Sequence, residues 1–220
     1  DNSQIDVAIL EIYGMFYEED DSGFTSEGVR DSSLNDFRYS DIKTETIRDC
    51  VPEELQKEYF FPLDKYHTRW EDLEYSSLSG LKESLINRYY EEDGRGFKHW
   101  SGAQECGYAS WDTIFSEKRR DVFKGNLEYL ERIYKECKTH GTRLILIKAP
   151  FPCYERTVEM TNTVMDWADE HDVELINCMK VTDVIGLDFG VDSLDGGTHL
   201  NESGGRKVSR YIAEYLKKII

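Results

Sequence analysis

The chain has 220 residues, which is enough for one α/β domain with a substantial core that needs no disulfide framework. Its formal net charge of −17 argues against nucleic acid as a partner, because no basic stripe is present to release counterions from phosphates. The five cysteines are scattered, and their spacing excludes a zinc ribbon or a thioredoxin-type site. No metal site and no cofactor site is predicted, because metal-ligand spacings of His and Cys are missing from the sequence.

The first half of the chain contains one clear element. Ile5–Ile12 (IDVAILEI) is a nearly continuous apolar run ending just before Gly14, which predicts a strand buried on both faces. Residues 18–58 are polar and acid-rich, which indicates loops and short helices. We therefore interpret residues 18–115 as a largely irregular insertion between the core strands of a single domain spanning 1–220.

The second half alternates between helical and strand patterns. In chain order, the periodicity predicts a helix over Arg119–His140, a strand over Leu144–Ala149, a helix over Glu155–His171, a strand over Val173–Asn177 and a helix over Ser203–Ile219. Gly141 is expected to stop the first of these helices. Strands alternating with helices in this order predict an α/β fold, in which a parallel sheet is joined by right-handed crossovers.

Ligands bind such sheets beyond the carboxyl ends of the strands. Three segments occupy that position in the predicted sheet, namely Tyr13-Gly14, Pro150-Phe151-Pro152 and Asp192–Asn201. The third segment is the most informative for chemistry, because it contains a histidine that lies just before a helix.

His199 in that segment is a candidate general base. The partial positive charge of a helix N-terminus disfavours the imidazolium, and a general base must be a neutral imidazole. Asp195 lies upstream and can accept a hydrogen bond from the other ring nitrogen, which would fix the tautomer. A purely structural interpretation is also open: His199 would end the loop, and Asn201 or Ser203 would cap the helix.

The C-terminal run resembles the last block of SGNH/GDSL hydrolases, and it is most similar to their bacterial cell-surface branch. The residues that carry this resemblance are Asp195, His199-Leu200-Asn201, Gly204-Gly205, Lys207-Val208-Ser209, Tyr211-Ile212 and Tyr215-Leu216. Two further segments are similar to family motifs: Tyr66-His67-Thr68-Arg69-Trp70 resembles a signature of that branch, and Ile5–Gly14 resembles the strand before the third block. The resemblance implies a three-layer α/β/α, SGNH- or flavodoxin-like fold whose first strands are missing.

The resemblance also implies chemistry. His199 would be the general base and Asp195 its orienting acid, while Gly14, His67, Arg69 and Asn201 would lie on the substrate side. The implied activity is that of a serine-type esterase or O-acyltransferase on acyl esters of bacterial cell-envelope polysaccharide. Its substrate would be an ester-bearing carbohydrate or another small acyl compound, with an envelope protein as a possible partner and an extracytoplasmic or cell-surface location.

Three departures from the family pattern leave alternatives open. One extra residue separates Asp195 from His199, which a bulge at Gly196-Gly197 could absorb, and Asp192 is the alternative acid. The third block lacks its asparagine, and no Gly-Asp-Ser or Gly-Ser-Ser box is present. We interpret the chain as starting at the third block, which would leave an apolar strand edge exposed. The alternative is a non-catalytic domain that binds carbohydrate or an envelope partner.

The aromatic segments also admit two interpretations. Trp70, Trp100 and Trp111 could form a sugar-stacking surface, although aromatic residues pack in cores more often. Arg69 could hold an anionic group of the substrate, but a structural ion pair with a neighbouring acid is slightly favoured.

Overall fold

The computed structural model describes residues 4–17, 27–34, 37–61, 101–104, 116–150, 155–196 and 199–219. The chain forms two compact units, which are described separately. Residues 1–17 and 98–220 form the larger unit, and residues 18–97 form the smaller one. The predicted insertion over 18–115, between the first two strands, includes the whole of this smaller unit.

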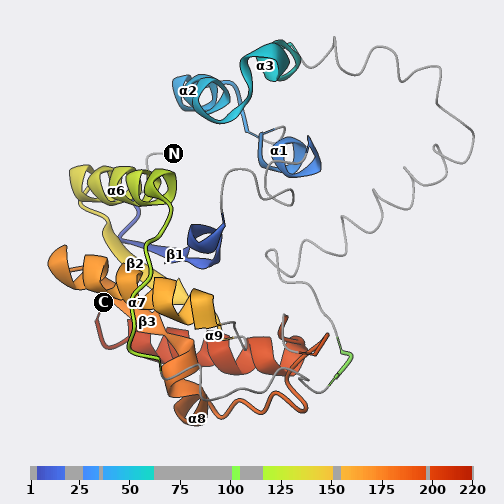
Figure 1. Ribbon diagram of the computed structural model, residues 1–220, viewed down its shortest axis with the longest axis vertical. Helices are drawn as coiled ribbons and strands as arrows, with labels where there is room; N and C mark the ends of the chain where they lie inside the picture. The colour runs from blue at the N-terminus through green and yellow to red at the C-terminus, as the bar shows by residue number, and fades with distance from the viewer. Residues whose placement is uncertain are drawn as a thin grey trace, which may run out of the picture. The chain divides into compact units, whose positions relative to one another are not determined.

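The larger unit contains a parallel sheet of three described strands. Their spatial order is β1 (Val7–Glu11), β2 (Arg143–Lys148) and β3 (Glu174–Asn177), as Figure 1 shows. Val7 lies beside Arg143 at the start of the first pair, and Ile145 lies beside Glu174 at the start of the second. The predicted α/β character and the three predicted strands are confirmed, with end positions that differ by one or two residues.

Helices α6 (Lys124–Thr139) and α7 (Glu155–Glu170) pack against one face of the sheet. Side chains alternate between the faces of a strand, so Leu144 and Leu146 of β2 point toward these two helices. The helices contribute the buried side chains of Leu130, Met160, Val164 and Ala168 to the same cluster.

Helix α9 (Glu202–Leu216) packs against the opposite face. It meets Ile145 and Ile147 of β2 and Ile176 of β3 with its apolar side, which includes Val208, Ile212 and Tyr215. Just beyond the helix, the carbonyl of Ile219 accepts a hydrogen bond of 3.1 Å from Arg143 Nη1 at the start of β2. The C-terminal end of α9 therefore lies at the amino-terminal edge of the sheet.

The direction of α9 follows from this contact. A helix rises about 1.5 Å per residue, and a strand rises about 3.3 Å per residue. The 15 residues of α9 and the six residues of β2 are thus of similar length, about 20 Å each. The helix runs antiparallel to the strands, and its first turn lies at their carboxyl ends.

Strand β1 differs from the prediction in its burial. Ile5 is 63% exposed and Ile9 is 46% exposed, so the expectation of a strand buried on both faces is wrong at these residues. Ile9 pairs with Ile145, which points to the face of the sheet that α9 covers. The buried strand residues under α9, however, belong to β2 and β3. In the part of the chain that the structure describes, β1 is hydrogen-bonded to β2 alone. The free side of β1 is therefore an apolar edge within the described residues.

Helix α6 begins at Lys124 rather than at the predicted Arg119. The preceding residues are not helical, and side chains tie them to α7. Arg119 binds both carboxylate oxygens of Asp166 at 2.8 and 2.9 Å, and Arg120 binds Glu159 at 2.9 Å. At its other end, α6 stops as predicted before Gly141, which has φ +67°.

The smaller unit contains three described helices, α1 (Glu27–Leu34), α2 (Asp41–Cys50) and α3 (Glu53–Phe60). Their buried side chains form one small core of Leu34, Ile47, Val51 and Tyr59. Ser40 caps α2 by accepting a hydrogen bond of 3.1 Å from the Lys43 backbone N–H. The predicted short helices of this region are therefore confirmed.

Gly204 in the first turn of α9 provides a test of the packing. A Cβ atom there would lie 2.6 Å from the backbone oxygen of Asp192 and 3.1 Å from Leu200 Cδ2. We expect Gly204→Ala to lower the free energy of unfolding by about 1–3 kcal/mol, because the contact is with backbone and cannot relax freely. Gly125→Ala is the matched control, because its Cβ would meet nothing within 4 Å.

The control should be neutral or stabilising, by up to about 1 kcal/mol, since alanine favours a helix. Urea unfolding of both variants measures the difference. Equal stability changes for the two substitutions would contradict the close approach at Gly204.

Candidate functional site

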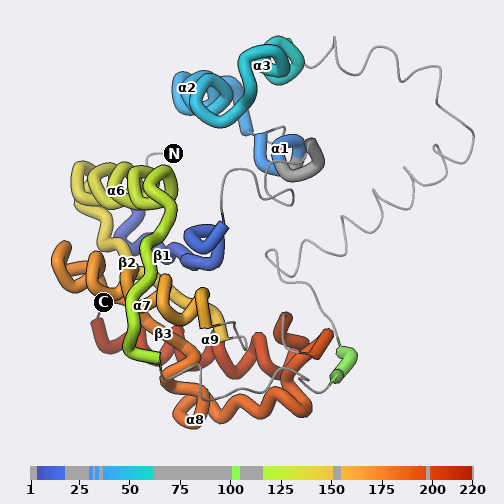
Figure 2. The backbone as a smooth tube through the Cα atoms, viewed as in Figure 1, coloured from blue at the N-terminus to red at the C-terminus, as the bar shows by residue number. Residues whose placement is uncertain are grey.

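The candidate site lies in the segment that joins the last strand to the last helix. After β3 the chain passes through η5 (Cys178–Val181) and α8 (Thr182–Ile185) before it enters α9, as the trace in Figure 2 shows. The residues from Asp192 to Asn201 fold back on themselves. Asn201 N donates to Asp192 O at 3.0 Å, and Leu194 N donates to His199 O at 2.9 Å. We call this segment the 192–201 hairpin.

Asp195 and His199 face one another within this hairpin. Asp195 Oδ2 lies 2.6 Å from His199 Nδ1, and Asp195 Oδ1 accepts a 2.8 Å hydrogen bond from the His199 backbone N–H. One carboxylate therefore holds both the backbone and the ring of the same histidine. The predicted acid and the predicted base are brought together in the expected arrangement.

The geometry determines which ring nitrogen can act as a base. An ionised carboxylate can only accept hydrogen bonds, so Nδ1 carries the hydrogen in this contact and Nε2 is the basic nitrogen of the neutral ring. The side chain of His199 is 59% exposed, and that of Asp195 is 39% exposed. The ring can therefore be reached from solvent.

The extra residue between Asp195 and His199 is accommodated at Gly196. Its φ of +81° lies in the left-handed region that glycine adopts without steric cost. The sequence predicts a bulge at Gly196-Gly197 that absorbs the extra residue; Gly196 has this positive φ, and Gly197 lies outside the described residues. This turn lets a D-x-x-x-H spacing close into a side-chain contact.

Asp192, the alternative acid, has a different environment. It is fully buried, and its Oδ2 accepts hydrogen bonds from Lys207 Nζ at 2.6 Å and from the Asp188 backbone N–H at 2.8 Å. Burial raises the pKa of Asp192, but the hydrogen bonds from Asp188, Lys207 and Ser203 outweigh it and hold the pKa below its ordinary value. Asp192 is therefore a buried anion paired with Lys207, and Asp195 is the residue that contacts His199.

Asn201 serves as the N-cap of α9. Its Oδ1 accepts from the Gly204 backbone N–H at 3.1 Å, while its Nδ2 donates to Gly102 O at 2.9 Å and to Val191 O at 2.7 Å. Both hydrogens of the amide are used within the protein, so neither remains for a substrate. The structural alternative for Asn201, a helix cap, is the one that the structure shows.

Of the remaining predicted substrate-side residues, Gly14 is the one that lies within the described ranges. Gly14 lies in η1 (Tyr13–Phe16), just past the carboxyl end of β1, in a turn held by Asn126 of α6. Asn126 Nδ2 donates to Met15 O at 3.1 Å and to Tyr17 O at 2.7 Å. His67 and Arg69 lie outside the described residues, as do Trp70, Trp100 and Trp111.

Polar residues that the sequence analysis missed line the carboxyl edge of the sheet. Glu11 joins the ends of β1 and β2, because its carboxylate accepts from Tyr13 N at 2.7 Å and from Ala149 N at 3.1 Å. Lys148 is almost fully buried at the end of β2, and its Nζ donates to Ala149 O at 2.9 Å. In the sequence, these residues could have been found as the charged residue near the end of each apolar run, Glu11 in IDVAILEI and Lys148 in LILIKA.

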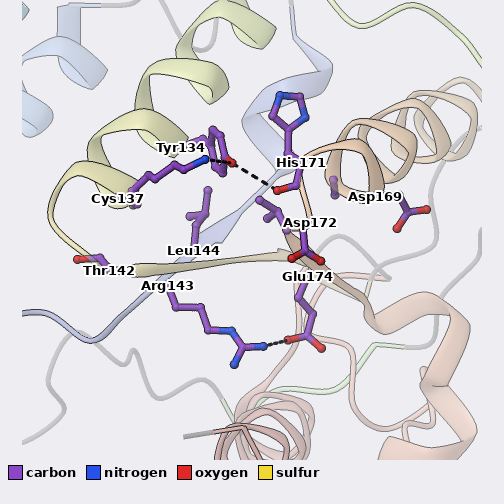
Figure 3. Close-up of a pocket in the computed structure, with 12 residues that line it drawn as sticks. Tyr134, Cys137, Thr142, Arg143, Leu144, Asp169, His171, Asp172 and Glu174 are labelled. Atoms are coloured by element: carbon purple, nitrogen blue, oxygen red, sulfur yellow. Dashed lines mark hydrogen bonds and ion pairs between the residues drawn. The ribbon is translucent and has the colours of Figure 1, made fainter.

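A separate pocket of about 730 Å³ lies at the opposite, amino-terminal edge of the sheet. Figure 3 shows it between the ends of α6 and α7. Three of its charged residues have neighbours within the pocket: Arg143 pairs with Glu174 at 3.3 Å, and Lys138 Nζ lies 3.2 Å from the Tyr134 hydroxyl. The hydroxyl in turn lies 3.4 Å from the carbonyl oxygen of His171. This pocket contains none of the predicted site residues.

Comparisons with known proteins add no assignment. The chain matches no protein-family model, no curated protein and no solved structure. Among the described residues, no group of three or more His, Cys, Asp or Glu side chains is arranged to hold a metal ion. None of the helices in the described ranges is long and apolar enough to cross a membrane.

Cys178, the first residue after β3, provides a test of burial at the carboxyl edge. Burial raises the pKa of its thiol to about 11, so little reactive thiolate is present at neutral pH. In the folded protein at about pH 8 we expect iodoacetamide to alkylate the exposed Cys50 readily and to leave Cys178 unmodified. Peptide mass mapping measures both sites, and Cys178 should react only after urea is added. Comparable rates at Cys50 and Cys178 without urea would show that this edge is open.

Proposed function

We propose that the larger unit is an SGNH-like domain that acts as a serine-type esterase or O-acyltransferase on acyl esters of bacterial cell-envelope polysaccharide. The observation that carries this proposal is the contact of 2.6 Å between Asp195 Oδ2 and His199 Nδ1 in an exposed hairpin. The hairpin leads into α9, whose first turn lies at the carboxyl ends of the strands. That edge is where α/β sheets bind their ligands.

The proposed chemistry uses the two nitrogens of one ring. Asp195 holds Nδ1–H, so Nε2 of His199 accepts the proton of a serine hydroxyl while the hydroxyl oxygen attacks the ester carbonyl. The imidazolium then returns its proton to the departing alcohol, which leaves an acyl-enzyme. Water releases the acyl group in an esterase, whereas a sugar hydroxyl accepts it in an O-acyltransferase.

The arrangement of the larger unit supports the fold part of the proposal. Helices α6 and α7 on one face of a parallel sheet, with α9 on the other, match a three-layer α/β/α domain. The exposed apolar edge at Ile5 and Ile9 fits an SGNH-like sheet without its first strands. The polysaccharide substrate, the envelope partner and the extracytoplasmic or cell-surface location rest on the family resemblance of the C-terminal run.

A non-catalytic SGNH-like domain is the second candidate. It is favoured by one observation, namely that the printed sequence contains no Gly-Asp-Ser or Gly-Ser-Ser box to supply the nucleophile. In this case the same exposed hairpin would contact carbohydrate or an envelope protein, and the Asp195–His199 contact would stabilise its shape.

Ester turnover by the His199→Ala variant separates the two candidates. For the enzyme, hydrolysis of 4-nitrophenyl acetate and of an O-acetylated polysaccharide should fall about 10²–10⁴-fold, because the general base is lost. His140→Ala is a matched control, since His140 pairs with Glu136 at 3.0 Å in the same i,i+4 arrangement at the C-terminal end of α6, where both side chains are exposed.

Urea unfolding should show that both histidine variants remain folded. A folded His199→Ala variant with full turnover would refute the proposed base. A wild-type protein that hydrolyses neither ester but binds the polysaccharide would favour the non-catalytic domain.

A further inference from the structure

A second acidic residue of the hairpin is engaged in an ion pair that the proposed chemistry does not use. Asp192 is fully buried at the base of the 192–201 hairpin, and Lys207 of α9 reaches it at 2.6 Å with a side chain that is 35% exposed. Asp192 also organises the turn before it, because Asp188 N donates to its Oδ2 and Asp192 N donates to Asp188 O at 2.7 Å. One carboxylate thus connects three parts of the chain.

The pair acts together with two other anchors at the base of the hairpin. Asn201 N donates to Asp192 O, so the two ends of the hairpin meet at this residue. Gly204 brings the first turn of α9 into direct contact with the Asp192 backbone. The hairpin base is therefore fixed to α9 by the Asp192–Lys207 ion pair, by the Asn201 cap of the helix and by the close backbone contact at Gly204.

The energetics make this anchor sensitive to substitution. Removing one partner of a buried ion pair leaves an uncompensated charge and is strongly destabilising. The carboxylate cannot move into solvent without breaking its bonds to Asp188 and Lys207. The backbone carbonyl of the same residue closes the hairpin at Asn201, so a shift of the Asp192 backbone would also displace Asp195, three residues farther along the chain.

We propose that Asp192 and Lys207 are positioning residues for His199. Their ion pair fixes the base of the 192–201 hairpin on α9, and so sets where Asp195 holds the imidazole and in which direction Nε2 is presented. The catalytic consequence rests on the proposed function, while the effect on the ring can be measured without any substrate.

The first experiment measures the ring nitrogens of His199 by NMR in protein labelled with ¹⁵N-histidine. At about pH 9, well above the ordinary histidine pKa of about 6.5, the two nitrogen shifts report which one carries the hydrogen. The His199→Ala spectrum assigns the signal among the five histidines. The wild-type ring should be in the Nδ1–H form that Asp195 selects.

Asp192→Asn is the main variant, because it removes the buried charge and keeps an oxygen that can accept from Asp188, while Lys207 can return its ammonium to water. We expect the ring of His199 to shift to a mixture dominated by the Nε2–H form that unrestrained histidines prefer. Lys207→Arg should keep the wild-type signal. Arg206→Gln is the matched control, because it removes a neighbouring exposed ion pair with Glu202 that does not involve the hairpin.

Urea unfolding identifies any variant that does not fold. If Asp192→Asn is unfolded, the double variant Asp192→Asn/Lys207→Gln, which leaves no unpaired charge, is measured in its place. A folded variant of either kind with unchanged His199 nitrogen shifts would overturn the proposal and leave the ion pair with a role in stability alone.

The second experiment uses ester turnover. A misplaced base costs on the order of 10²-fold in kcat, so Asp192→Asn should lose about that factor with little change in KM, and Lys207→Arg should retain activity. If His199→Ala keeps full turnover, the proposed function fails, but the nitrogen shifts still decide whether Asp192 and Lys207 position the ring. A changed tautomer with unchanged kcat would refute the catalytic part of the inference.

Discussion

The burial of β2 on both faces is the constraint on which the larger unit depends. Ile145 and Leu146 are adjacent in the strand, point to opposite faces, and are both fully buried. Each face therefore needs its own cover, which α6 and α7 supply on the side of Leu146 and α9 supplies on the side of Ile145. Such cover is typical of parallel sheets, whose strands are commonly buried on both faces. The positions of the helices follow from this requirement.

Helix α9 connects that core to the candidate site. Its apolar side packs on the sheet along most of its length, and the Arg143–Ile219 contact fixes its C-terminal end. Since the helix is about as long as the strand, core packing also determines where its first turn lies. The 192–201 hairpin enters α9 at Asn201, and Gly204 allows direct backbone contact between the two. The position of His199 is thus set by packing that lies one helix length away.

Most of the sheet and its helices could be predicted from sequence, because the period of the apolar residues reports burial directly. The contact of Asp195 with His199 could also be predicted, since both residues lie in one short segment before a helix. Other features depend on contacts between distant segments. Arg119 and Arg120 bind α7 just before the late start of α6, and Ile9 is exposed on an outer strand of the described sheet. An apolar pattern cannot show either effect.

The two aspartates of the hairpin show why spacing alone did not assign their roles. Asp192 and Asp195 have the same chemistry and are both close enough in sequence to reach His199. Burial and partners separate them: Asp192 is fully buried and its Oδ2 is held by Lys207 and Asp188, whereas Asp195 remains accessible and binds the ring. A buried carboxylate needs a cation, and the nearest one lies on α9, 15 residues farther along the chain. Lys207 therefore binds Asp192 at the base of the hairpin, and Asp195 is the acid that binds the histidine. One aspartate anchors the hairpin to α9, and the other orients the ring of His199.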